Sequence, residues 1–326
     1  MIKNPVVVSL GDPSGIGTEV FLKAVFESSL KEYTELITVV ASKKVLSSIA
    51  QKLNYQNFES LNIVEVELDS EFILGKPNIK NGSYVIKCLN KAADICYKEK
   101  KSLVTGPINK KIITNKISNF SGHTEFLQKK YNCDDVLMLL TNNFLKIGVA
   151  TTHVALKDVS NMITKDLIMS KLKLLEQGLT NIFRIKKPKI AILGLNPHAG
   201  EAGSYGSEEI EHIQPAIAEL NSQGLNLIGP ISADTAFIDN KYNAYLSMYH
   251  DQALPVLKTL DFQHSVNITL GLPFIRVSVD HGTAEDIAMD LVADYTSMLE
   301  ALKLAGNGET IKKKSWSKFF KRSPFS

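Results

Sequence analysis

The segment from residue 249 to residue 286 is rich in side chains that can bind anions, transfer protons or hold metals. In chain order these are His250, Asp251, Lys258, Asn267, Arg276 and His281. Residues 267–279 between them are mostly apolar and are interrupted by Gly and Pro, as in buried strands joined by a turn. Polar side chains spaced along buried strands tend to face a cleft, so this segment is the first candidate for a functional site.

Three histidines each follow directly on a strand-like segment, namely His153, His198 and His250. The strand ends of an open α/β sheet meet at one edge, so residues distant in sequence can converge there. Neutral imidazole is a common ligand for Zn, Co or Ni, and three protein ligands with an open position are typical of a catalytic metal site. Asp234 and Asp251 could orient the imidazoles. The chain has no HExxH pair, so separate structural roles for these histidines stay open.

His123 and Thr124 follow a glycine at the start of a predicted helix, where they would present an imidazole and a hydroxyl to a ligand. The simpler alternative for Thr124 is a helix N-cap. A glycine-rich turn, GDPSGIG at residues 11–17, lies between a strand-like run and an amphipathic helix. It lacks the GxGxxG spacing and the P-loop lysine, so a tight turn is favoured over a phosphate cradle.

Short strand-like runs alternate with helical patterns along the chain, which predicts an α/β fold with a parallel or mixed sheet covered by helices. The predicted strands are 5–10, 37–40, 63–66, 103–104, 136–140, 145–150 and 187–193, and the main predicted helices are 43–53, 83–99, 164–182 and 208–221. Residues 229–235 are predicted to form a loop. A chain of 326 residues favours two domains.

The composition, 44% hydrophobic and 22% charged, is that of a globular protein without a membrane span. The formal charge of +3 is due to the tail, residues 312–326, which holds six basic and no acidic residues. The remaining 31 basic residues face 34 acidic ones, so nucleic acid is not an expected partner. Three cysteines without CxxC spacing and a start unlike a signal peptide indicate a cytoplasmic protein.

Nine motifs occur in the order seen in the 4-hydroxythreonine-4-phosphate dehydrogenase family, which the chain resembles from about residue 5 to about residue 305. They are GDPSGIGTE, TGPINK, SGHTEFL, TTHVALKDV, LNPHAGE, ADT, YHDQALPVLK, NITLGLPFIR and DHGTAEDIA. The resemblance implies two α/β/α domains around a central cleft, as in the isocitrate and isopropylmalate dehydrogenases. We expect a discontinuous first domain, 1–130 plus 265–311, and a second domain, 131–264. The segment between Asp234 and His250 is shorter than in the family, and the tail has no counterpart there.

The resemblance also implies the site. His153, His198 and His250 would hold one divalent cation, Zn, Mg or Co, in a homodimer with a shared active site. The implied substrate ligands are His123, Thr124, Lys258, Asn267 and Arg276. Asp234 and Asp251 match acids that keep the site in order, and together with Lys258 they are the candidate catalytic residues. Either Lys258 or a metal-bound water would accept the proton. The alternative for Lys258 is that it binds the phosphate and takes no part in proton transfer.

The motif DHGTAEDIA is similar to the loop that holds the adenosine half of NAD in the decarboxylating dehydrogenases. It assigns His281, Gly282, Thr283, Ala284 and Asp286 to the cofactor. A carboxylate at position 286 can accept hydrogen bonds from ribose hydroxyls and would repel a 2′-phosphate, which favours NAD over NADP. The alternative is that Asp286 caps a following helix.

The implied reaction is oxidation of 4-phosphooxy-L-threonine to 2-amino-3-oxo-4-(phosphooxy)butanoate, which decarboxylates to 3-amino-2-oxopropyl phosphate in vitamin B6 synthesis. Two alternatives stay open: a related dehydrogenase of erythronate or threonate 4-phosphate, and a non-catalytic protein that binds a phosphorylated ligand. The aromatic and basic residues of the tail are typical of membrane-surface or nucleic-acid-binding segments. A disordered appendage is the alternative, and membrane contact is not expected.

Overall fold

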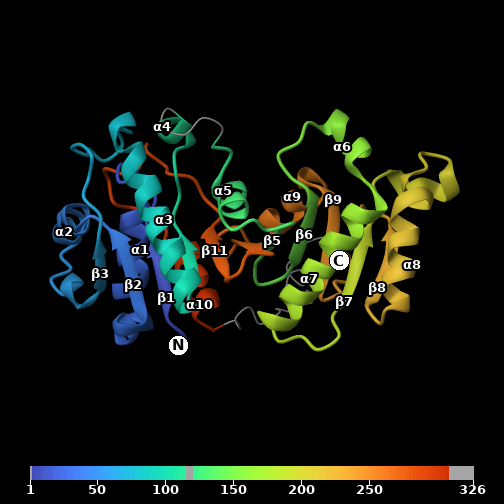
Figure 1. Cartoon of the computed structure of the whole chain (residues 1–326), viewed down its shortest axis with the longest axis horizontal. Helices are drawn as coiled ribbons and strands as arrows, with labels where there is room; N and C mark the ends of the chain where they lie inside the picture. The colour runs from blue at the N-terminus through green and yellow to red at the C-terminus, as the bar shows by residue number, and fades with distance from the viewer. Residues whose placement is uncertain (1, 115–119, 308–326) are drawn as a thin grey trace, which may run out of the picture. The chain divides into compact units, whose positions relative to one another are not determined.

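The computed structural model describes residues 2–114 and 120–307, so the predicted tail, 312–326, lies outside the described residues. The chain divides into two compact units (Figure 1). The first comprises Met1–Asp134 with Leu272–Thr310, and the second is built from Asp135–Gly271. The predicted domain boundaries fall at 130/131 and 264/265. No helix among the described residues is long and apolar enough to cross a membrane.

The first unit has five parallel strands in the order β3-β2-β1-β4-β11. Its elements are β1 (Val6–Ser9), α1 (Gly17–Phe26), β2 (Ile37–Ala41), α2 (Lys43–Lys52), β3 (Asn62–Glu65), α3 (Gly82–Glu99), β4 (Ser102–Thr105), α4 (Lys110–Thr114), α5 (His123–Lys130), β11 (Arg276–Val279) and α10 (Thr296–Asn307). Single turns of 3-10 helix lie in the loops of this unit. Strands β1, β2 and β4 are buried throughout, as expected for a parallel sheet covered on both faces.

Alternation along β1 explains how helices cover both faces of this sheet. Val7 is part of a buried cluster with Leu89 of α3, whereas the side chain of Val6 lies close to Gly306 at the end of α10. Successive side chains of a strand point to opposite faces, so α3 and α10 lie on opposite sides of the sheet.

The second unit has a mixed sheet in the order β10-β5-β6-β9-β7-β8. Its elements are β5 (Leu137–Thr141), β6 (Lys146–Thr151), α6 (Leu156–Met162), α7 (Lys165–Asn181), β7 (Lys189–Leu193), η4 (Pro197–Gly203), η5 (Glu209–Ile213), α8 (Gln214–Ser222), β8 (Asn226–Ile231), β9 (Ala244–Tyr249), α9 (His250–Asp261) and β10 (Val266–Leu270). The pairs β10/β5 and β5/β6 are antiparallel, whereas β6, β9, β7 and β8 run parallel.

Strand β6 shows the same alternation. Ile147 and Val149 lie in a buried cluster with Leu254 of α9. A side chain added at Gly148 would instead meet Leu175 of α7 at 3.3 Å. Helices α9 and α7 therefore cover opposite faces of the second sheet, and the predicted α/β fold with a mixed sheet is confirmed.

Two elements of the second unit differ from the prediction. Residues 229–231, predicted as part of a loop, form the end of β8, although Pro230 lies within them. Strand β8 is at the edge of the sheet, where the missing N–H of a proline costs no ladder bond. Residues 250–261, for which no helix is predicted, form α9 with Pro255 inside it.

Gly106 allows the turns after β1 and β4 to meet in the first unit. Its N–H donates to the carbonyl of Ser9 at 2.8 Å, and an added Cβ would lie 2.4 Å from the carbonyl oxygen of Leu10. We expect Gly106→Ala to lower the free energy of unfolding by about 1–3 kcal/mol in urea titrations, because the backbone must move. Gly282→Ala is the matched control, since an added Cβ there meets nothing within 4 Å. Equal stability of the two variants would refute this account of the turn.

Candidate active site

The parallel strands of the second unit bring four predicted site residues to one edge of its sheet. These strands lie in the order β6-β9-β7-β8. His153 follows β6, His250 follows β9, His198 follows β7 and Asp234 follows β8. The carboxyl ends of parallel strands are where ligands bind in open α/β sheets. The sheet therefore gathers residues that are up to about a hundred positions apart in sequence.

His153 and His250 lie close together. Their strands pair with Thr151 opposite Tyr249, and the centroids of the two imidazole rings are 6.4 Å apart. Nδ1 of His250 is 2.8 Å from Oδ1 of Asp251. A carboxylate bound to Nδ1 holds the proton on that nitrogen and leaves Nε2 as the atom that can bind a cation.

His198 lies in an unusual turn after β7. Its φ is 51°, and Ala199, Gly200, Glu201 and Ala202 also have positive φ, so the chain makes one left-handed turn. Each residue other than glycine costs roughly 1–2 kcal/mol in this conformation. Among residues 2–114 and 120–307, no three His, Cys, Asp or Glu side chains lie close enough together to hold a metal ion. Of the three predicted metal ligands, His153 and His250 thus lie close together within one chain.

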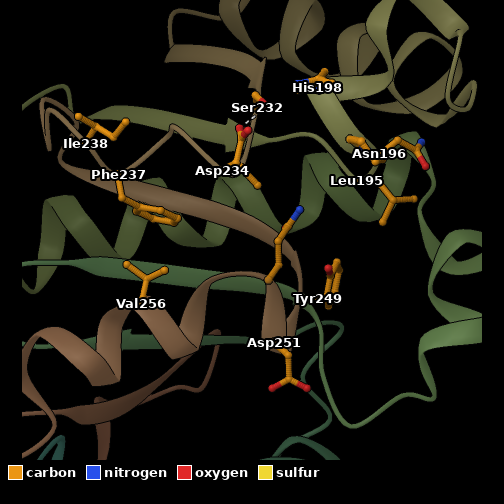
Figure 2. Close-up of a pocket in the computed structure, with 13 residues that line it drawn as sticks. Leu195, Asn196, His198, Ser232, Asp234, Phe237, Ile238, Tyr249, Asp251 and Val256 are labelled. Carbon is orange, nitrogen blue, oxygen red and sulfur yellow. Dashed lines mark hydrogen bonds between the residues drawn. The ribbon is translucent and has the colours of Figure 1, made fainter.

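A pocket of about 650 Å³ opens beside these strand ends (Figure 2). His198 and Asp234 contribute polar groups at one end of it, Asp251 lies at the other, and Phe237 and Val256 form an apolar wall. The hydroxyl of Ser232 donates to Asp234 at 2.6 Å and lowers the pKa of that exposed carboxyl below its ordinary value. An apolar wall with a few polar groups is typical of small-molecule sites.

Gln252 connects the ends of β7 and β9 through two hydrogen bonds. It was not among the predicted site residues. Its Nε2 donates to the carbonyl of Gly194 after β7 at 2.6 Å, and its Oε1 accepts from the N–H of Met248 in β9 at 2.7 Å. The only sequence signal for Gln252 is its position in the motif YHDQ, because a side-chain amide that bonds to the backbone has no characteristic sequence pattern.

Lys258 and Asn267 belong to the same unit. Lys258 lies on α9, eight residues after His250, and its Nζ is 5.4 Å from the ring centroid of Phe262. Asn267 lies on β10, opposite Leu140 of β5, and is partly buried.

In the first unit, Arg276 connects β11 to β4 and α5. Its Nε and Nη2 both donate to Oγ1 of Thr105, at 3.1 and 2.7 Å, and Nη1 is 3.4 Å from Oγ1 of Thr124. Arg276 is only 3% exposed, and this burial lowers its pKa to about 10, so it remains a cation at neutral pH. Thr124 is the second residue of α5 rather than its N-cap, which is Gly122.

His123 lies near Arg276 and next to Thr124, and these three residues are called the cationic cluster below. Burial lowers the pKa of His123 well below the ordinary value, and the charges of Arg276 and Lys110 lower it further. The imidazole is therefore neutral at pH 7 and can donate or accept one hydrogen bond at each nitrogen. Together with the N–H groups at the start of α5, the cluster provides a setting for a phosphate or carboxylate.

The predicted cofactor loop follows β11. Nδ1 of His281 is 2.9 Å from the carbonyl of Gly282, and Oγ1 of Thr283 donates to Glu285 at 2.7 Å. Ala284 has a φ of 44°, and turns rather than a helix follow the exposed Asp286. No helix follows Asp286 directly, so the alternative role of Asp286 as a helix cap is not supported.

The turn after β1 packs directly on this loop. The carbonyl of Thr283 accepts from the N–H of Ile16 at 3.0 Å, and a Cβ on Gly15 would lie 2.7 Å from the same oxygen. Asp12 and Ser14 are buried in the turn, and neither Asp12 Oδ2 nor Ser14 Oγ has a hydrogen-bond partner among the described residues. The prediction of a tight turn did not single out these two side chains.

Comparisons with known proteins support the resemblance seen in the motifs. The family model described as pyridoxal phosphate biosynthetic protein PdxA matches residues 9–305. A protein of Yersinia enterocolitica named 4-hydroxythreonine-4-phosphate dehydrogenase is 42% identical over 322 residues, covering 93% of this chain and 96% of the relative. One of Colwellia psychrerythraea with the same name is 40% identical, covering 93% and 97%.

Solved structures agree with this match. The 4-hydroxythreonine-4-phosphate dehydrogenase of Klebsiella pneumoniae superposes with a TM-score of 0.82 at 30% identity, covering 93% of this chain and 98% of that one. A putative enzyme of the same name from Salmonella typhimurium gives 0.83 at 30% identity, covering 94% and 100%. The predicted family is confirmed.

The buried carboxyl of Asp12 supplies a test of this part of the site. Burial raises its pKa from 3.8 to about 6, so the folded state binds more protons between these pH values and stability falls as pH rises through them. We expect Asp12→Asn to raise the free energy of unfolding by about 3 kcal/mol at pH 8. The amide keeps the Oδ1 acceptor for the N–H of Ser14, which now lies 2.9 Å away, and removes the charge.

The measurement is urea unfolding from pH 4 to pH 8. The variant should lose the decline in stability between pH 4 and pH 6 that Asp12 causes. Asp290→Asn, a change at an exposed aspartate of the same unit, should leave the profile unchanged. A destabilised Asp12→Asn at pH 8 would contradict the assignment.

Proposed function

The chain belongs to the family of pyridoxal phosphate biosynthetic protein PdxA, and we propose from this that it oxidises 4-phosphooxy-L-threonine at its C3 hydroxyl with NAD. It is an oxidoreductase acting on a CH–OH group, with a role in the synthesis of pyridoxine 5′-phosphate. The observation that carries the proposal is identity of about 40% over more than nine tenths of the chain to relatives named for this activity.

The reaction transfers two electrons. A hydride leaves C3 of the substrate for the nicotinamide ring, and the C3 hydroxyl gives its proton to a base. The product, 2-amino-3-oxo-4-(phosphooxy)butanoate, is a β-keto acid, and its ketone can accept the electron pair released when the carboxylate leaves as CO2. Protonation of the resulting carbon gives 3-amino-2-oxopropyl phosphate.

The cationic cluster of the first unit supports a phosphate-binding role. Arg276 is a buried guanidinium suited to two-pronged anion binding, and His123 and Thr124 add an imidazole and a hydroxyl at the start of α5. We assign these three to the substrate phosphate. In the second unit, Lys258 and Asn267 are the further substrate ligands that the family motifs propose.

We propose that His153, His198 and His250 hold one divalent cation, with Zn, Mg and Co as candidates. The donor set fits such an ion, since His153 and His250 already lie together and Asp251 fixes the tautomer of His250. When bound, the cation lowers the pKa of a hydroxyl placed on its open position. Lys258 is our candidate proton acceptor, and Asp251 and Asp234 orient the groups around it.

We propose that the third imidazole comes from the second subunit of a homodimer. Within one chain no third ligand joins His153 and His250 among the described residues, whereas His198 lies on a separate exposed turn. Apolar side chains are exposed after both segments: Leu156 is 69% and Tyr205 is 54% exposed.

The loop after β11 is our candidate for the cofactor. His281, Gly282, Thr283 and Ala284 would line the adenosine half, and the exposed carboxylate of Asp286 would bind the ribose hydroxyls and disfavour NADP. We further propose a cytoplasmic location, where the free thiols of Cys88 and Cys96 would stay reduced.

The proposed activity has a direct test. NADH formation at 340 nm should appear with 4-phosphooxythreonine and NAD, fall with NADP or erythronate 4-phosphate, and disappear with a chelator. His250→Ala should lower kcat/KM by at least about 100-fold, because it removes a proposed metal ligand. His212→Ala, a change outside the site, should keep the activity. Turnover of His250→Ala at the wild-type rate would refute the metal assignment.

Mixed dimers test which histidine crosses the interface. Two inactive variants, His198→Ala and His153→Ala, are co-expressed with different tags and purified as the heterodimer. If His198 completes the site of the other subunit, one of the two sites is intact and about half of the wild-type activity returns. The heterodimer of His153→Ala with His250→Ala should stay inactive. Activity in that second heterodimer but not in the first would show that His198 does not cross.

A further inference from the structure

The turn that carries His198 is folded around one buried carboxylate. Glu209 is 1% exposed, and its two oxygens both point at the residue that begins the turn. Oε1 accepts the backbone N–H of Asn196 at 2.8 Å, and Oε2 accepts Nδ2 of Asn196 at 2.9 Å. In the part of the chain that the structure describes, no Lys, Arg or His forms an ion pair with it. Its charge is balanced by amide donors of this turn.

The turn closes over the carboxylate so tightly that only glycine fits at two positions. A Cβ on Gly200 would lie 2.7 Å from Oε2 of Glu209. A Cβ on Gly194, at the end of β7, would lie 2.6 Å from Cα of Ala199 and 3.1 Å from Oε1 of Glu209. Residues 194–200 are therefore wrapped around the carboxylate, and His198 lies in the middle of them.

The element that presents Glu209 is itself irregular. Residues Glu209–Ile213 form a π-helical turn before α8 begins at Gln214. Pro215 has no N–H with which to close the α-helical bond to Glu211, so the chain widens at this point. Single π turns inside helices occur frequently at functional sites.

We propose that Glu209 is the positioning residue that holds His198 in its left-handed turn, ready to bind the divalent cation. The inference rests on the proposed metal site. Six successive residues with positive φ, 198–203, do not persist by themselves, and charge-assisted hydrogen bonds to a buried carboxylate are strong enough to hold them. Glu209 does not touch the substrate and acts only through His198.

Glu209→Gln is the sharpest variant, because it keeps the size of the side chain. Its new NH2 group must face one of the two donors of Asn196, so one hydrogen bond becomes a contact between donors. Glu211→Gln is the matched control: it makes the same change two residues later, at an exposed glutamate of the same π turn. Asn196→Ala removes the Nδ2 donor to Glu209, together with its 2.8 Å bond to Oε2 of Glu208, and keeps the backbone donor.

The full-length protein is titrated with Co²⁺ alone, and binding is followed by the visible absorption of the ion. We expect Glu209→Gln and Asn196→Ala to weaken Co²⁺ binding by about 10–100-fold, while Glu211→Gln binds as the wild type does. Equal binding by Glu209→Gln and the wild type overturns the proposal, and so does equal weakening by Glu211→Gln. If Glu209→Gln fails to fold, Asn196→Ala decides the question by the same criterion.

A second readout needs no metal. Amide hydrogen exchange of residues 196–205 in the metal-free protein should be faster in Glu209→Gln and Asn196→Ala than in the wild type or Glu211→Gln. Unchanged exchange in both variants overturns the positioning role. If wild-type protein binds no Co²⁺ while exchange responds as expected, the proposed metal site fails and the role of Glu209 in shaping the turn stands.

Discussion

The parallel pairing of β6, β9, β7 and β8 is the constraint on which the candidate site depends. Parallel strands end at the same edge, so a ligand placed after each strand is brought to that edge whatever its position in the sequence. The burial of this sheet on both faces by α9 and α7 fixes the register. A shift by one residue would turn every core side chain to the wrong face, so the packing energy of the core also fixes the positions of the candidate site residues.

Sequence reasoning recovered the fold and most of its elements, because hydrophobic patterns report burial directly. Strand β2 and helices α2 and α7 lie within one or two residues of their predicted ends. Helix α9 was missed because Pro255 and the polar residues at its start hide the helical pattern. Strand β8 was cut short at Pro230, since a proline marks a loop unless the strand is known to be at the edge.

The sequence indicates candidate residues for the site but not their geometry. The motifs indicated His153, His198 and His250, but no pattern indicates that His198 sits in a left-handed turn of mostly non-glycine residues. Such a turn is unfavourable locally and exists because distant groups stabilise it. Gln252 and Glu209 escaped notice because each bonds to a backbone group of another segment of the chain, Gly194 and Asn196 respectively.

The two units divide the chemistry between opposite electrostatic requirements. In the first, Arg276 stays charged although burial lowers its pKa, whereas burial keeps His123 neutral, which suits an anion that must be recognised without being protonated. The second leaves His250 partly exposed and held by Asp251, which suits a ligand whose free nitrogen must bind a cation. A phosphate-binding site can be rigid and shielded from water, because its ligand is already an anion when it binds. The proposed three-imidazole site would need its third ligand held in place, and the hydrogen bonds between Glu209 and Asn196 stabilise the turn that carries His198.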